Sequence, residues 1–115
     1  MIRRNCKSRK TILRVDFLDE GTTICEKYAV ETLKSVIKKI GLKKVANACL
    51  INIDSILHCN NVPLITKMKD EVYEYRQHDM GDGWLIFTGT STLVKKKQLE
   101  MLNDIFHLKM RISIV

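Results

Sequence analysis

Apolar and polar residues alternate over residues 11–17, which is the period-two pattern of a half-buried β-strand. One face of this segment is apolar: Leu13, Val15 and Phe17. Residues 19–21, Asp-Glu-Gly, offer a turn because glycine accepts positive φ, and residues 22–25 return to β-favouring side chains. This pattern predicts a β-hairpin over residues 11–25.

Helical spacing begins at residue 27 and continues to residue 40. Apolar side chains recur there every three or four positions: Val30, Leu33, Ile37 and Ile40. Gly41 is expected to end this helix, because glycine readily adopts the left-handed conformation that closes a helix, and residues 42–49 should add one or two further turns. A second long helix is predicted over residues 92–106, with four side chains facing inward: Leu99, Leu102, Ile105 and Phe106.

The other apolar segments are short, as strands are: residues 50–53, 56–59, 62–65, 84–88 and 108–115. Asn60 and Asn61 predict a turn between two of them, because asparagine tolerates positive φ. Pro63 cannot donate a backbone hydrogen bond, which places its strand at a sheet edge. Residues 66–82 are rich in charge and lack a clear period, so they predict a long surface loop. The alternative there is a short helix lined by Met68, Val72 and Tyr75.

The resulting order, β-β-α-(α)-β-β-loop-β-α-β, predicts an α+β fold. We expect two layers, with a single, mostly antiparallel sheet and the helices packed on one face of it. A chain of 115 residues suffices for one hydrophobic core, so residues 11–115 are predicted to form one domain. Residues 1–10 are predicted to form a basic, flexible N-terminal arm.

The amino-acid composition excludes some classes of protein. The apolar fraction of 45% excludes a wholly disordered chain, and no apolar run is long enough to cross a membrane. The first residues lead into no apolar secretory segment, so we expect a cytoplasmic protein without membrane association. Four cysteines form no close pair: Cys6, Cys25, Cys49 and Cys59. This spacing favours reduced thiols, with Cys25 and Cys49 in the core, and predicts neither a metal site nor a cofactor.

Positive charge is concentrated in blocks and adds up to a net +7. Residues 1–14 hold six basic residues and no acid, and residues 34–44 hold five lysines and no acid. Clustered cations favour a nucleic-acid partner, because phosphate contacts gain free energy by releasing counterions. The alternative is a solvated charged surface that keeps a small protein in solution.

A turn rich in glycine and hydroxyl side chains enters the second long helix at residues 88–97, and lysines crowd the helix start. Helix N-termini carry partial positive charge and bind anions, so the lysines suggest that a phosphate offsets them. The predicted phosphate-contact residues are Ser91, Thr92, Lys95, Lys96 and Lys97. The alternative is that Ser91 or Thr92 only caps the helix, that Lys96 pairs with Glu100, and that the lysines are solvated. The spacing of a phosphate-binding P-loop is absent.

Two further segments are candidates for the same interface. Lys34 and Lys38 lie on the polar side of the first helix, where they would contact phosphates or simply remain solvated. Tyr73, Tyr75 and Arg76 are candidates for stacking on exposed bases, with ordinary packing as the alternative.

The sequence gives little support for a catalytic activity. The three histidines show no metal-ligand spacing. His58 and Cys59 are neighbours on a predicted strand, so their side chains point to opposite faces and would not form a nucleophile–base pair. We expect that the protein is not an enzyme.

Several segments resemble small bacterial proteins of unassigned function. These are residues 12–17, 29–33, 39–45, 62–65, 83–84, 90–92 and 96–99, together with the closing strand. The resemblance implies a self-standing α+β domain of bacterial origin and assigns no activity or site residue.

Charge and candidate sites together predict a small, basic, non-catalytic nucleic-acid-binding accessory or regulatory protein that contacts phosphates through helix-borne lysines. The alternative is a protein-interaction module that docks by an edge strand near residues 62–66 or forms a homodimer.

Overall fold

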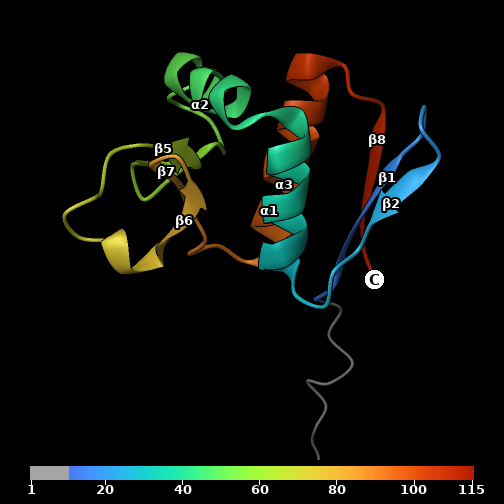
Figure 1. Ribbon diagram of the computed structural model, residues 1–115, viewed down its shortest axis with the longest axis horizontal. Helices are drawn as coiled ribbons and strands as arrows, with labels where there is room; N and C mark the ends of the chain where they lie inside the picture. The colour runs from blue at the N-terminus through green and yellow to red at the C-terminus, as the bar shows by residue number, and fades with distance from the viewer. Residues whose placement is uncertain (1–10) are drawn as a thin grey trace, which may run out of the picture.

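The computed structural model describes residues 11–115, and the predicted basic arm, residues 1–10, lies outside the described residues. Two helices, α1 (Ala29–Ile40) and α3 (Thr92–Phe106), stand at the centre. One sheet lies on one side of them, and smaller sheets with a third helix lie on the other (Figure 1). The predicted α+β class is confirmed.

The first sheet is antiparallel and has the strand order β2-β1-β8. Its strands are β1 (Leu13–Phe17), β2 (Thr22–Ile24) and β8 (Met110–Ile114), which confirms the predicted hairpin and closing strand. The side chains of Leu13, Val15 and Phe17 are buried, as the alternation predicts.

The side chain of Asn103 on α3 reaches the outer edge of β8. Leu18 N–H donates to Lys109 O, so the backbone groups of Met110, the next residue, point away from β1. Asn103 Nδ2 donates to Met110 O, and Met110 N–H donates to Asn103 Oδ1, both at 3.0 Å. A side-chain amide therefore takes the place of a neighbouring strand at this position.

Both predicted long helices are confirmed, α3 with the predicted bounds and α1 beginning at Ala29 instead of residue 27. Gly41 ends α1 with a φ of 120°, a conformation that favours glycine. Its N–H donates to Ile37 O at 2.9 Å.

The strand predicted over residues 50–53 is wrong, because α2 (Leu42–Ile51) extends into it. A short apolar run does not distinguish a strand from a helix, and here the helix continues beyond the predicted one or two turns. Its buried side chains are Val45, Ala46, Ala48 and Cys49. Leu50 and Ile51 point to solvent and are 72% and 80% exposed.

A two-stranded ribbon follows, formed by β3 (His58–Cys59) and β4 (Val62–Pro63). Asn60 and Asn61 have φ values of 56° and 63°, which confirms the turn. Because β4 pairs only with β3, Pro63 lies on an edge strand, as predicted. The single strand predicted over residues 62–65 is divided at Leu64, after which β5 (Ile65–Thr66) joins another sheet.

This other sheet has the order β5-β7-β6 and contains β6 (Gln77–Gly81) and β7 (Trp84–Phe87). The loop predicted over residues 66–82 is therefore only partly right, since it includes β6 and a 3₁₀ turn, η2 (Glu74–Arg76). Only Met80 among the side chains of β6 is buried, so the strand has no apolar pattern to reveal it.

The prediction of one sheet with helices on one face is wrong. Each three-stranded sheet has a central strand, β1 or β7, whose two edges are already occupied, and no strand within residues 11–115 connects the sheets. Helices α1 and α3 instead form a middle layer between the sheets (Figure 1).

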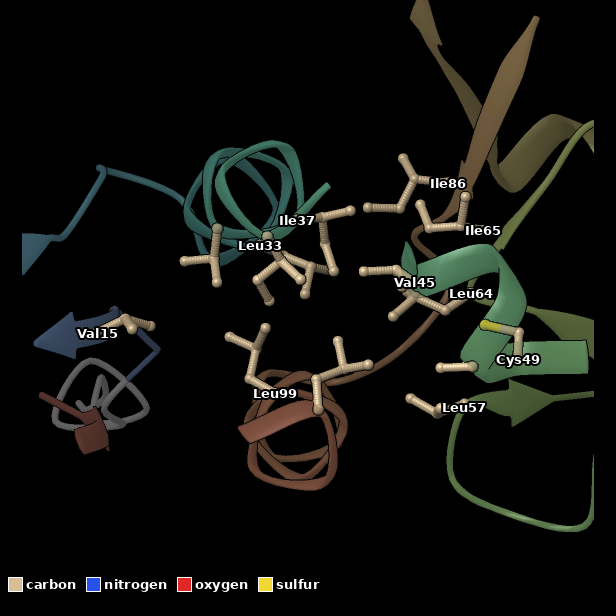
Figure 2. Packing of buried hydrophobic residues seen from close by; sticks show 14 of the residues in the cluster. Val15, Leu33, Ile37, Val45, Cys49, Leu57, Leu64, Ile65, Ile86 and Leu99 are labelled. Carbon is tan, nitrogen blue, oxygen red and sulfur yellow. The ribbon is translucent and has the colours of Figure 1, made fainter. Parts of the chain in front are cut away.

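The core lies on both sides of this middle layer. Leu33 and Ile37 of α1 point toward Leu99 of α3 (Figure 2). Val15 approaches from the first sheet, and Ile86 from the sheet that contains β7. All five side chains are 0% exposed. The central helices are therefore apolar on two faces, which explains why two sheets cover them.

Replacing Leu99 by alanine should test this two-sided core. We expect Leu99→Ala to lower the free energy of unfolding by about 2–5 kcal/mol, because it removes buried methyl groups and leaves a cavity. Leu93→Ala is the matched control on the same helix: Leu93 is 52% exposed, and its loss should change stability by less than about 0.5 kcal/mol. Urea unfolding followed by circular dichroism measures both, and equal effects would contradict the core described here.

Candidate nucleic-acid interface

The segment around Arg76 and the turn that enters α3 are separate candidates for the nucleic-acid interface in the sequence, and they lie against each other in the structure. The Thr88 N–H and hydroxyl both donate to Arg76 O, at 2.8 Å and 3.0 Å. A Cβ placed on Gly89 would clash with Arg76 Cδ and with the ring of Phe87. The link between β7 and α3 is thus packed beneath η2, and glycine permits this close approach.

The aromatic candidates in this region have different environments. Tyr73 is partly buried and packs edge-on against Phe87, with ring centroids 6.2 Å apart, which is the ordinary packing alternative. Tyr75 is 68% exposed, and the guanidinium of Arg76 lies 5.2 Å from its ring centroid. Arg76 is exposed as well. Tyr75 and Arg76, which we call the Tyr75–Arg76 pair, therefore present an aromatic ring and a cation together to solvent.

Lys95 lies inside the molecule and is 5% exposed. Its Nζ donates to Thr88 O, Thr90 O and Thr90 Oγ1, at 2.5–3.3 Å, and so holds together the turn that precedes α3. Burial lowers the pKa of this amine below that of an exposed lysine. Its three donors are used within the fold, so Lys95 is unavailable to an external phosphate.

The other predicted residues of the α3 start make mostly internal contacts. Ser91 Oγ accepts a hydrogen bond from Val94 N–H at 3.2 Å and caps the helix. The Thr92 hydroxyl donates to Thr11 O at 3.4 Å. Lys96 pairs with Glu100 at 2.8 Å, the helical pairing offered as the alternative.

Lys97 differs from its two neighbours in the lysine run. It is exposed, and it makes no ion pair among residues 11–115. Of the three lysines near the α3 start, Lys97 therefore keeps a charge that an external anion can reach.

The lysines of α1 and α2 are also divided between paired and unpaired. Lys34 lies 3.8 Å from Glu31, and Lys39 lies 2.8 Å from Glu20. In the described part of the chain, three exposed lysines near the α1–α2 junction have no carboxylate within ion-pair distance: Lys38, Lys43 and Lys44. Three cations without a carboxylate partner thus fall within residues 38–44, and one of them, Lys44, lies 5.5 Å from the ring centroid of Phe106.

Carboxylates pair with three of the other cations in residues 11–115: Arg14, Lys109 and Arg111. On the outer face of the first sheet, Arg14 and Arg111 lie 3.2 Å and 3.5 Å from Asp16. A hydrogen bond from the Thr23 hydroxyl at 2.6 Å, together with these two arginines, holds the pKa of Asp16 below its ordinary value.

Residues 11–115 contain 15 Lys+Arg and 13 Asp+Glu, so five of the seven net positive charges belong to residues 1–10.

Two residues of this region differ from the predicted site: His78 lies outside the predicted stacking residues, and Lys95 does not have the predicted role of a phosphate contact. His78 on β6 places Nε2 3.4 Å from the Thr88 hydroxyl, beside the Tyr75–Arg76 pair. Lys95 supports the turn from within. The apolar period of α3 gave a usable signal for Lys95, since residue 95 precedes the buried Gln98 and Leu99 by three and four positions and so shares their face.

Cysteine and metal chemistry adds no second site in the described residues. Cys49 is buried, as predicted, and burial raises the pKa of its thiol, but Cys25 is exposed and does not join the core. Within residues 11–115, no group of three or more His, Cys, Asp or Glu side chains is placed to hold a metal ion. None of the helices in this range has the length and apolar character needed to span a bilayer.

Comparison with known proteins gives no assignment, since no family model, no curated protein and no solved structure matches the chain. The resemblance to small bacterial proteins of unassigned function stays a prediction.

The buried amine of Lys95 should make stability depend on pH in a definite direction. Its folded-state pKa lies below the ordinary 10.5, so the unfolded chain binds more protons as pH rises through the interval between the two values. The free energy of unfolding of the wild type, minus that of Lys95→Met, should therefore increase as pH approaches 10.5.

Urea unfolding at pH 7 and at several alkaline pH values measures this difference. Lys96→Met is the control, because Lys96 forms a solvent-accessible pair and should give a nearly constant difference. A difference for Lys95→Met that stays flat or falls with pH would show that the amine is not buried as described.

Proposed function

We propose that the protein is a non-catalytic, cytoplasmic nucleic-acid-binding accessory or regulatory protein that holds single-stranded segments. The observation that carries the proposal is the Tyr75–Arg76 pair, an exposed ring with an exposed guanidinium 5.2 Å from its centroid, beside the turn into α3. Aromatic rings and arginine planes are the groups on which unpaired bases stack.

The distinction between paired and unpaired lysines supports a smaller set of phosphate contacts than the sequence predicts. Lys97 and Lys38 are exposed and unpaired among the described residues, so they remain available for phosphate contacts. Three lysines are excluded from the proposed phosphate contacts, because each already interacts with a partner within the fold: Lys95, Lys96 and Lys34. Ser91 and Thr92 likewise use their hydroxyls internally.

A single-stranded ligand fits the charge distribution better than a duplex does. The described residues carry a net charge of only +2, and six of their 15 cations lie within ion-pair distance of a carboxylate. Affinity for duplex DNA depends mainly on neutralising many phosphates, whereas single strands add base stacking, which is worth about 1–3 kcal/mol per base. The Tyr75–Arg76 pair supplies a stacking surface without requiring a large cationic face.

Fluorescence anisotropy with a labelled single strand and a matching duplex should test the proposal across a range of salt concentrations. We expect the single strand to bind more tightly and its log affinity to fall linearly with log salt. Tyr75→Ala should weaken binding by about 5- to 150-fold, which corresponds to the loss of one stacked base. Arg76→Ala should weaken binding and also reduce the salt slope by roughly 0.7, as for one lost phosphate contact on a single strand.

Tyr28 provides a matched control elsewhere on the surface. It is 60% exposed and carries a cation, Lys27 Nζ, 5.5 Å from its ring centroid. Tyr28→Ala should leave binding unchanged if the Tyr75–Arg76 pair is specific. Undetectable binding at low salt, or equal losses from Tyr28→Ala and Tyr75→Ala, would overturn the proposal.

A further inference from the structure

Apolar side chains at the end of α2 face solvent. Leu50, Ile51 and Ile53 are 72%, 80% and 61% exposed. The opposite side of α2 packs into the core, so most of the surface of these three side chains stays outside it. Contiguous exposed apolar residues of this kind are typical of a surface that another molecule covers.

A groove lies directly beside them, between α2 and β5. Its cavity has a volume of about 150 Å³ and is lined by Ala46, Asn47, Cys49, Leu50, Pro63, Ile65, Thr66, Lys67 and Trp84. A cavity of this size accepts a group as large as benzene. The groove is therefore large enough for one apolar side chain of a partner.

Among the residues that line the groove, one is cationic and none is acidic. Lys67 is the charged residue among its lining, and its Nζ lies 4.7 Å from the ring centroid of Trp84. Lys43 is exposed on α2, three and four positions before the lining residues Ala46 and Asn47, and so shares their side of the helix. A complementary segment would offer an apolar side chain next to a carboxylate.

This chain carries such a segment beside its own groove. Ile53 and Asp54 are consecutive and exposed, three and four positions after the groove residue Leu50. When a segment and its complementary groove lie on the same surface, two copies related by a twofold axis can each insert the segment into the groove of the other. The assembly then closes as a dimer. Charge complementarity thus selects a second copy of this chain as the occupant.

We propose that the protein forms a twofold homodimer in which Ile53 of each protomer enters the groove of the other. Asp54 then approaches Lys67 of the partner subunit, and Leu50 and Ile51 are covered in the same interface. The edge strand β5 is only two residues long and α2 packs against it, so strand addition is not part of this proposal. Side chains at the end of α2 form the contact instead.

Light scattering coupled to size exclusion should give a mass near twice 13.3 kDa, with reductant present and nucleic acid removed. Leu50→Asp and Ile53→Asp should each raise the dimer dissociation constant roughly tenfold or more, because a carboxylate then enters an apolar contact. Val72→Asp is the matched control, since Val72 is 68% exposed on a different surface segment and should leave the dimer intact. Circular dichroism confirms that each variant remains folded.

Charge reversal identifies the partner of each side chain. Asp54→Lys alone and Lys67→Asp alone should each weaken the homodimer by placing like charges together. An equimolar mixture of the two variants should restore a dimer, because each contact then joins opposite charges. A monomer at every concentration, a dimer insensitive to these substitutions, an equal loss from Val72→Asp, or a mixture that stays monomeric would overturn the proposal.

Discussion

Burial of the central helices on two sides determines most of this structure. Leu33 and Ile37 on α1 and Leu99 on α3 are wholly buried, and they need apolar partners beyond one another. The first sheet supplies Val15 from one direction, and the sheet containing β7 supplies Ile86 from the other. A single sheet on one face would leave the second apolar side of the helix pair in water, at a cost of about 1.5–3 kcal/mol for each large side chain exposed.

The same arrangement creates the candidate interface. Because the second sheet lies across the helices from the first, the chain must leave β7 and enter α3 through a short link, residues 88–91. Lys95 fixes this link from within through Thr88 and Thr90, and Arg76 packs over Gly89 from outside. The Tyr75–Arg76 pair is therefore attached to the framework of the core, and its position beside α3 follows from the path of the chain.

The elements that could be predicted from sequence are those with a strong period. Both central helices, the opening hairpin and β8 follow their hydrophobic patterns closely. The failures have physical causes: Leu50 and Ile51 are apolar but exposed, and β6 has few apolar side chains because it lies at an edge. Neither the burial of Lys95 nor the pairing of Lys39 with Glu20 follows from local charge, because the acceptors are chosen by tertiary packing. The Lys96–Glu100 pair, in contrast, follows from helical spacing. The encounter of Arg76 with Gly89 depends on contacts between segments that no periodicity connects.

The amide of Asn103 has a further consequence for the behaviour of the protein in a concentrated solution. Outer strands with free backbone groups recruit other chains and seed fibrous aggregates. By bonding both backbone groups of Met110, Asn103 closes the first rung that an incoming strand would need at this end of β8. At this end of β8, one side chain thus blocks the addition of a further strand, while the end of α2 remains an exposed apolar surface for specific association.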